Sequence, residues 1–290
     1  MITLRPRRIV FAAATCAAAS AFPAAYAENL IFDSELAYAH EDNVGRAARA
    51  VDAADDDIAS ARVATTWLKP LTETAGLSAT GAAEYQRFLT WSDLSHWQFS
   101  GQLAYRYKPN PAFDAVWYEL ELAGAIREFA ASRIRDGARL TAGAALGRDL
   151  TAQLQLRVGY RYTADRAWHQ AVFDTDLHRF YLNGEWRRGR ATWYGGAGWQ
   201  TGDTQSTAAD NDRIEAVASA DAPDPALSTT SRPRIAYRLD ADTITTTLGC
   251  NFALQPNLAL DVAALYFDAD SATGAHYVGY RVSVRVLYRF

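Results

Sequence analysis

The chain contains little cysteine, which excludes a disulfide-stapled scaffold. Its 290 residues include two cysteines, Cys16 and Cys250, and Cys16 lies in an N-terminal segment that we expect to be removed. The mature chain would then keep one cysteine and no intrachain disulfide. Long hydrophobic runs are lacking as well. No stretch after residue 27 offers the roughly 18 consecutive apolar residues of a membrane helix.

The chain also lacks an excess of positive charge. The chain has 29 basic and 33 acidic residues, a formal net charge of -4, and Lys69 and Lys108 are its two lysines. A general nucleic-acid binder needs a basic face that neutralises phosphates, so we expect no nucleic-acid partner. With 49% hydrophobic and 12% aromatic residues, the chain is too apolar for a disordered protein.

The N-terminus has the pattern of a secretory signal. Arg5, Arg7 and Arg8 form a basic start, residues 9–22 form an alanine-rich apolar core, and residues 25–27 read Ala-Tyr-Ala, a small-x-small cleavage site. An N-terminal membrane anchor is the alternative, but the apolar stretch is short for a bilayer span. We therefore predict that residues 1–27 are a cleaved signal peptide.

Strict alternation is clearest at the C-terminus. One set of side chains is aromatic or β-branched, and the other set carries three arginines. The apolar set is Tyr280, Val282, Val284, Val286, Tyr288 and Phe290, and the alternate set is Arg281, Ser283, Arg285, Leu287 and Arg289. Period-two alternation predicts a strand with one apolar and one polar face. A terminal aromatic residue after alternating apolar positions resembles the C-terminal signal that outer-membrane barrels present for insertion, which assigns Tyr288 and Phe290 as the membrane-assembly signal.

The same alternation recurs along the chain. It predicts about twelve strands, which we place at residues 30–42, 57–69, 75–90, 96–107, 114–128, 136–148, 152–163, 176–187, 190–201, 233–252, 257–268 and 275–290. Their apolar faces end in Tyr or Trp, as aromatic girdles at a membrane interface do. In residues 233–252 the parity changes near Ala241, which indicates a bulge or a strand that extends beyond the membrane.

The connections sort by length. Those after even-numbered strands are short, and those after odd-numbered strands are longer, the longest being residues 202–232. Short turns on one side and long loops on the other are typical of outer-membrane barrels, whose even strand number places both termini in the periplasm. We therefore predict an all-β fold in which residues 28–290 form a single transmembrane antiparallel β-barrel with short periplasmic turns and longer extracellular loops. A soluble β-sandwich is the alternative, but it would not be expected to sort its loops in this way.

The polar parity then faces the lumen. The candidate pore-lining residues are the bases Arg157, Arg161, Arg179, Arg281, Arg285 and Arg289 and the acids Asp33, Glu35, Glu119, Glu121 and Asp261. We expect Asp261 to face the arginines of the last strand, which closes against the first strand and so approaches Asp33 and Glu35. A guanidinium ladder favours passage of anionic solutes. The alternative is that these charges pair across strands and fill a narrow barrel.

The loops are acidic, and the 202–232 loop is rich in small polar residues. We expect this loop to be flexible or folded partly into the lumen. The five histidines fall near the long-loop ends, but none are spaced as metal ligands, so we assign no metal and no cofactor. We also assign no catalytic residues. Ser92 and Ser95 lie near His96 but in a loop, and no nucleophile elbow is present.

Two short phrases carry a family resemblance. Leu36-Ala37-Tyr38 followed by Glu41-Asp42-Asn43-Val44, and later Gly202-Asp203-Thr204 with Ser206-Thr207, are similar to phrases of uncharacterised proteobacterial outer-membrane barrels of the small, porin-like, twelve-stranded class. The resemblance implies a location in the bacterial outer membrane and a barrel architecture.

Fold and lumen together predict a porin-like channel for small solutes, possibly anionic ones, and not an enzyme. A structural or accessory barrel of a surface-assembly or export system is the alternative, and a lipid-modifying outer-membrane enzyme is a third. The partners implied are outer-membrane lipid and lipopolysaccharide, the barrel-assembly machinery and small solutes.

Overall fold

A computed structural model describes residues 30–271 and 274–290, and for residues 212–213 the backbone alone. The predicted signal peptide, residues 1–27, lies outside the described residues. Thirteen strands form one antiparallel sheet that closes when the last strand pairs with the first. They are β1 (Leu30–Glu41), β2 (Asp56–Pro70), β3 (Ala75–Phe88), β4 (His96–Tyr107), β5 (Trp117–Phe129), β6 (Gly137–Asp149), β7 (Leu154–Ala167), β8 (Thr175–Arg188), β9 (Ala191–Ala208), β10 (Ala220–Pro223), β11 (Ile235–Gln255), β12 (Leu258–Ser271) and β13 (His276–Arg289).

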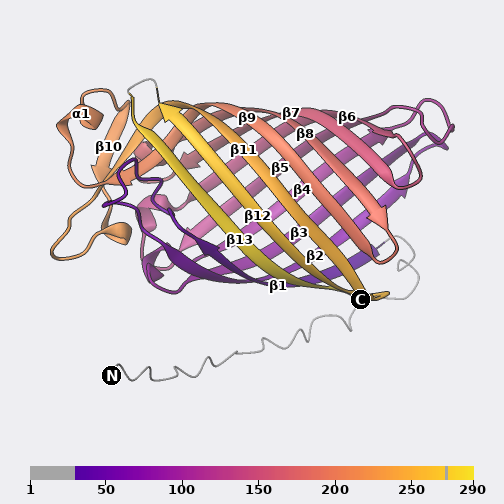
Figure 1. The fold of residues 1–290 in the computed structure, drawn as a ribbon, viewed down its shortest axis with the longest axis horizontal. Helices are drawn as coiled ribbons and strands as arrows, with labels where there is room; N and C mark the ends of the chain where they lie inside the picture. Colours follow the sequence, from indigo (N-terminus) through magenta and orange to yellow (C-terminus); the bar gives the residue numbers. More distant parts are fainter. Residues whose placement is uncertain (1–29, 272–273) are drawn as a thin grey trace.

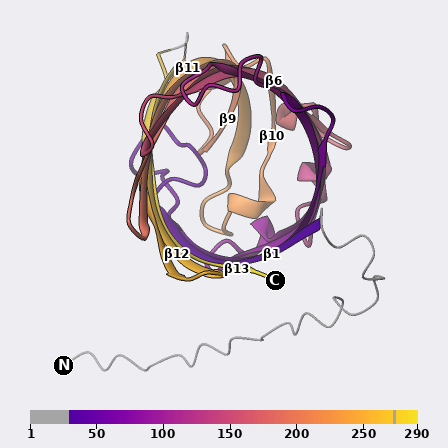
Figure 2. The same ribbon diagram turned by 90° about the vertical axis from the view of Figure 1, so that its right-hand side faces the viewer.

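Twelve of these strands make the barrel wall (Figures 1 and 2). The short strand β10 is an addition, because it pairs with β11 beyond the last β12 partner, while β9 pairs with the whole length of β11 up to Phe252. The predicted all-β, twelve-stranded antiparallel barrel is therefore confirmed. No helix in the described part of the chain is long and apolar enough to cross a membrane.

The apolar parity faces outward along every wall strand, as period-two alternation requires. Its side chains remain exposed because no described part of the chain covers them. They include Leu36, Tyr38, Trp97, Phe99, Leu103, Leu120, Leu122, Leu146, Val158, Phe180, Leu182, Trp193, Ile244, Leu248, Val262, Tyr280, Val282, Val284 and Val286. An apolar outer surface of this extent is stable in hydrocarbon and unfavourable in water.

Short turns and the C-terminus lie at one end of the barrel, and the longer loops lie at the other (Figure 1). At the turn end the backbone N–H of Phe290 donates to the carbonyl oxygen of Phe32 at 2.9 Å. We name five connections at the loop end: L1 (residues 42–55), L2 (89–95), L3 (130–136), L4 (168–174) and L5 (209–234). Four of the turns are short and L1 and L5 are long, as predicted. The β4–β5 turn is an exception, because β5 begins at Trp117 and the turn, residues 108–116, is longer than L2, L3 or L4.

The sequence prediction was wrong about where the longest loop begins. β9 continues past Gly202 to Ala208, and β11 begins at Ile235. The parity change near Ala241 marks the strand extension and not a bulge, since the β9–β11 register is continuous there and the register shift of β11 falls between Ala253 and Gln255.

The parity reverses in this extension because loop L5 covers one of its faces. Tyr237 and Leu239 have no exposed surface and pack with Ile214 of L5 on that face. The alternate face carries Arg238 and the exposed Asp240, and Ala236 at its end packs with Val172 and Phe173 of L4.

Candidate functional site

The inner wall formed by β4–β8 carries a cluster of opposite charges. Glu119 and Glu121 of β5 alternate inward, and they meet arginines of two strands, β4 and β7. Arg106 Nη2 lies 2.7 Å from Glu119 Oε2, Arg157 Nη2 lies 2.5 Å from Glu119 Oε1, and Arg161 Nε lies 2.6 Å from Glu121 Oε1. We call the four arginines Arg106, Arg157, Arg161 and Arg179, with the two glutamates beneath them, the guanidinium stripe.

Contacts from β5 to β7 skip the strand between them. At the level of the two glutamates, β6 contributes Gly143 and Ala145, which are too small to separate β5 from β7. A Cβ atom on Gly143 would lie 2.6 Å from Glu121 Oε1. Small residues on β6 therefore let each carboxylate reach a guanidinium two strands away.

The two charge types differ in exposure. The Glu119 and Glu121 side chains are 11% and 7% exposed, whereas Arg106 is 57% and Arg161 is 34% exposed. The carboxylates lie against the wall and the guanidinium groups lie over them. Water in the lumen consequently meets the arginines first.

Arg179 adds positive charge to the stripe without an acid of its own. Within the described residues it makes no salt bridge; its Nη2 donates to Thr245 Oγ1 at 3.4 Å. It lies directly across from Arg161 in the β7–β8 register. Counting Arg106, the stripe therefore holds four guanidinium groups over two carboxylates.

The opposite wall, formed by β1–β3 and β11–β13, is balanced. Arg285 Nε lies 3.0 Å from Asp261 Oδ1, and Arg289 Nε lies 2.9 Å from Asp33 Oδ1. Arg281 Nη1 lies 3.8 Å from Glu41 Oε2. Glu35 shares a hollow of about 490 Å³ with Arg281 and Arg285 on this wall. The structure thus brings all eleven predicted residues to the inner wall, but in two groups of different charge balance.

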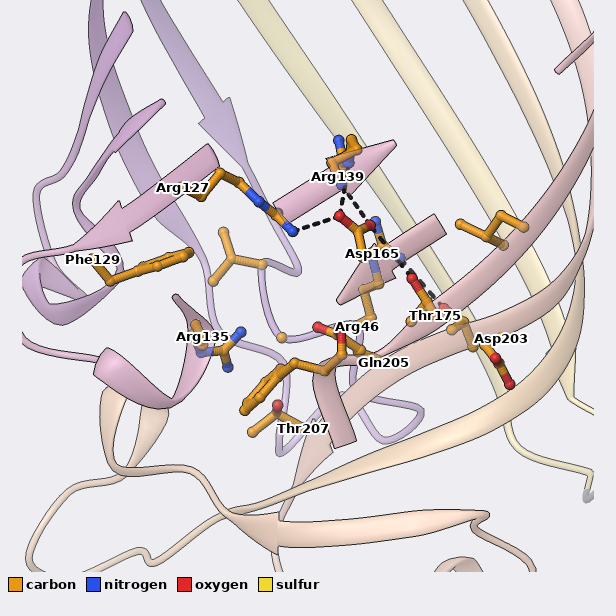
Figure 3. A pocket seen from close by; sticks show the side chains of 15 residues that line it. Arg46, Arg127, Phe129, Arg135, Arg139, Asp165, Thr175, Asp203, Gln205 and Thr207 are labelled. Atoms are coloured by element: carbon orange, nitrogen blue, oxygen red, sulfur yellow. Dashed lines mark hydrogen bonds and ion pairs between the residues drawn. The ribbon is translucent and has the colours of Figure 1, made fainter. Parts of the chain in front are cut away.

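A cavity of about 210 Å³ lies where the long loops meet the wall (Figure 3). We call it the loop cavity. Its basic residues are Arg46 of L1, Arg127 of β5, Arg135 of L3 and Arg139 of β6, and its acids are Asp165 and Asp203. Arg127 Nη2 lies 2.7 Å from Asp165 Oδ1, and Arg139 Nη2 lies 2.9 Å from Asp165 Oδ2, so one carboxylate serves two guanidinium groups.

Loop L5 lies across the extracellular mouth and contacts loops from the other side of the barrel. Leu227 of L5 packs with Leu94 of L2 and Ala54 of L1, although L5 leaves β9 and L2 precedes β4. Arg234 donates to the Asp52 carbonyl oxygen at 2.6 Å and lies 5.4 Å from the Trp91 ring centroid. Figure 2 shows β9 and β10 within the outline of the barrel.

A buried ion pair joins L5 to L3. Arg135 pairs with Asp224, whose side chain has no exposed surface, and Thr207 Oγ1 donates to the same carboxylate at 2.9 Å. Burial lowers the pKa of Arg135, and the adjacent Asp224 carboxylate opposes that shift. A charge pair out of water is strongly destabilised by the loss of either member, so this pair fastens L5 over the mouth.

The roles of Arg46, Arg135 and Asp224 were not predicted, because these residues lie in loops, where alternation gives no information. The inward aromatic residues Trp117 and Tyr194 were not predicted either. A signal for both was present. Each ring lies over a glycine of the adjacent strand, Trp117 over Gly147 and Tyr194 over Gly249. A Cβ atom on either glycine would clash with the ring above it.

Ser95 of L2 and His96, the first residue of β4, have local partners. His96 Nδ1 lies 2.9 Å from the Leu94 carbonyl oxygen, and Ser95 Oγ accepts from the Phe88 backbone N–H at 3.1 Å. At the β12–β13 rim, ligand atoms of Asp268, Asp270 and His276 lie within 4.8 Å of one another. His276 Nε2 pairs with Asp268 at 2.7 Å, which accounts for their proximity.

The closed antiparallel wall, the apolar exterior, the charged interior and the sorted loops define an outer-membrane β-barrel. Among solved structures, an outer-membrane channel from Pseudomonas putida F1 is similar to the chain, with 10% identity over 93% of this chain and 99% of that one and a TM-score of 0.59. This likeness confirms the predicted fold. The NanC porin has 10% identity over 89% of this chain and 98% of its own, with a TM-score of 0.47. The KdgM porin in complex with disordered oligogalacturonate has 11% identity over 89% and 99%, with a TM-score of 0.43. No protein-family profile and no curated protein matches the chain.

Proposed function

We propose that the chain is a porin-like channel that passes small anionic solutes across the bacterial outer membrane. One observation carries the proposal: in the guanidinium stripe, arginines lie over buried carboxylates and outnumber them. A row of exposed guanidinium groups offers planar N–H donors to carboxylate or phosphate. Cations would meet the same charge as a barrier.

Loop L5 restricts this passage to small solutes. Because it crosses the mouth and is fastened to L1, L2 and L3, a solute entering from outside would pass between loops and wall. The loop cavity lies on that route and continues toward the guanidinium stripe through Arg127 and Arg139.

Single-channel conductance in a planar bilayer under a salt gradient tests the proposal. We expect stable steps with anion preference, and we expect Arg179→Gln to lower that preference because Arg179 has no acid to release when it is removed. Arg188→Gln is the matched control, since Arg188 is an exposed arginine at the turn end that lies over the Trp186 ring. Cation preference in the wild type, or equal effects of both variants, would contradict the proposal.

An accessory barrel in a surface-assembly or export system is the second candidate, and the covered mouth favours it. A folded barrel that conducts nothing and purifies with a partner protein would support it. We propose no enzymatic activity, because the hydroxyl of Ser95 and the ring of His96 are both engaged in local turn contacts. Lipid, lipopolysaccharide and the barrel-assembly machinery are the partners that such a barrel would meet.

A further inference from the structure

The loop cavity has the size of a small-molecule site. Its volume of about 210 Å³ is well above the roughly 10–15 Å³ that one water requires, so it has room for several waters or one compact organic molecule. Eight parts of the chain line it: L1, L3, L4, the ends of β5, β6, β7 and β8, and the extension of β9. It is therefore a partly open space between loops and wall and not a hollow in one element.

The charged side chains around the cavity sum to one net positive charge. Arg127 and Arg139 share the single carboxylate of Asp165, which also accepts from Thr175 Oγ1 at 3.4 Å. Arg135 is neutralised by Asp224.

Arg46 and Asp203 are the remaining charged residues of the cavity, and they balance each other. Arg46 Nη1 donates to Thr204 Oγ1 at 3.3 Å, and Asp203 Oδ2 accepts from the Asp176 backbone N–H at 3.2 Å. One bound monoanion would therefore bring the whole cluster to neutrality, with Arg127 and Arg139 beside it.

Part of the lining is apolar. Phe129 of β5 stacks on His96 with a distance of 4.6 Å between ring centroids. The Phe173 ring of L4 lies beneath Arg135, whose guanidinium carbon is 4.4 Å from the ring centroid. Figure 3 shows Phe129 pointing toward the cavity beside Arg127. Val44 and Leu177 add aliphatic surface. Most of the exposed lining is polar, and these side chains form its smaller, apolar part. A ligand pocket needs both kinds of surface, and here the charged groups predominate.

We propose that the loop cavity binds a small monocarboxylate with an apolar body, its carboxylate at Arg127 and Arg139 and its body against Phe129 and Phe173. The proposal rests on the proposed function, since it names a solute class for the same channel. The site lies directly under L5, so a solute of this class would be bound before it meets the guanidinium stripe.

Equilibrium binding of benzoate to the purified full-length barrel in detergent tests the site. We expect measurable binding of benzoate, and at least tenfold weaker binding of benzyl alcohol, which lacks the charge, and of acetate, which lacks the apolar body. Because charge-assisted hydrogen bonds are the strong ones, Arg127→Gln should weaken benzoate binding by about tenfold. Arg285→Gln is the control, since Arg285 lies on the other wall and does not line the cavity.

Arg46→Gln provides a second variant with little effect on folding, because among the described residues the Arg46 side chain donates to the Thr204 hydroxyl alone, and the backbone hydrogen bond of Arg46 to Asn43 does not involve the side chain. It should also weaken benzoate binding. Equal affinity for acetate and benzoate, no binding of benzoate, or unchanged binding in both cavity variants would overturn the proposal. Anion conductance without benzoate binding would contradict this binding site but not the channel function. Benzoate binding without conductance would contradict the channel function but not the binding site.

Discussion

Tyr181 occupies the space that a side chain at Gly159 would need. A Cβ atom on Gly159 would lie 2.5 Å from the phenol ring, and the ring in turn lies between Arg157 and Arg161, whose guanidinium carbons are 5.6 and 5.7 Å from its centroid. A backbone position on β7 thus holds the aromatic ring that separates two arginines of the guanidinium stripe. Packing and charge placement in the lumen depend on the same contact.

Gly159→Ala should displace Tyr181 and destabilise the barrel. Overpacking of this kind costs about 1–3 kcal/mol, and the free energy of unfolding in urea and detergent measures it. The shift of Tyr181 should also change the anion preference, because Arg157 and Arg161 lose their spacer.

Gly101→Ala is the matched control for that variant. Gly101 is a strand glycine of β4 at which a Cβ atom would meet nothing within 4 Å. Equal destabilisation by both substitutions would show that the loss is a general glycine effect and would contradict the role given to Tyr181.

Asp224→Asn should loosen loop L5. The variant leaves Arg135 buried without its carboxylate, and breaking a buried pair typically costs about 3–5 kcal/mol. We expect faster cleavage within residues 209–234 by an added protease and a larger single-channel conductance. Asp221→Asn, at an exposed position of β10 in the same loop, should change neither; a loop equally resistant in both variants would contradict the fastening role of Asp224.

The turn between β4 and β5 should respond to acid. Arg148 Nη2 donates to Asp114 Oδ2 at 2.8 Å, and this hydrogen bond holds the pKa of Asp114 below its ordinary value of 3.8. A depressed carboxyl pKa contributes stability that is present above 3.8 and is lost as the pH falls through the lowered value.

A carboxyl NMR titration checks this shift. Arg148→Gln should return the pKa of Asp114 toward 3.8, whereas Lys108→Gln should leave most of the shift, since Lys108 is its smallest cause. An Asp114 pKa that is the same with and without Arg148 would contradict the assignment.

Deletion of Phe290 should impair membrane assembly. The ring is 60% exposed on the outer face and packs edge-to-face on Tyr288 with a centroid distance of 4.8 Å, so it is available to a receptor that reads a terminal aromatic residue. The measurement is the heat-modifiable fraction in isolated outer membranes. Arg289→Gln keeps the aromatic pair and should assemble normally; normal insertion of the deletion would argue against a terminal signal.

The wall of the barrel could be predicted from sequence because each wall strand has one lipid-facing and one lumen-facing side. Two different solvents impose two different side-chain classes, and the period-two pattern follows. Where loop L5 covers one face, as at Tyr237 and Leu239, the parity reverses, and the extension of β9 that pairs with this segment was not predicted.

The inner charges could likewise be named from parity, but their partners could not. Glu119 and Glu121 pair with arginines two strands away because Gly143 and Ala145 leave room, and that geometry depends on register and tilt. The loop residues Arg135 and Asp224 are 89 residues apart. Nothing in local sequence indicates that they meet.

The buried carboxylates of the lumen have one more consequence. An arginine free in water samples many rotamers, and immobilising it on a passing solute would cost conformational entropy each time. Glu119, Glu121 and Asp165 already hold their arginines in place from behind. A solute in the lumen therefore meets donors that are ordered before it arrives, and it can be recognised at each step and released again without rearranging the wall.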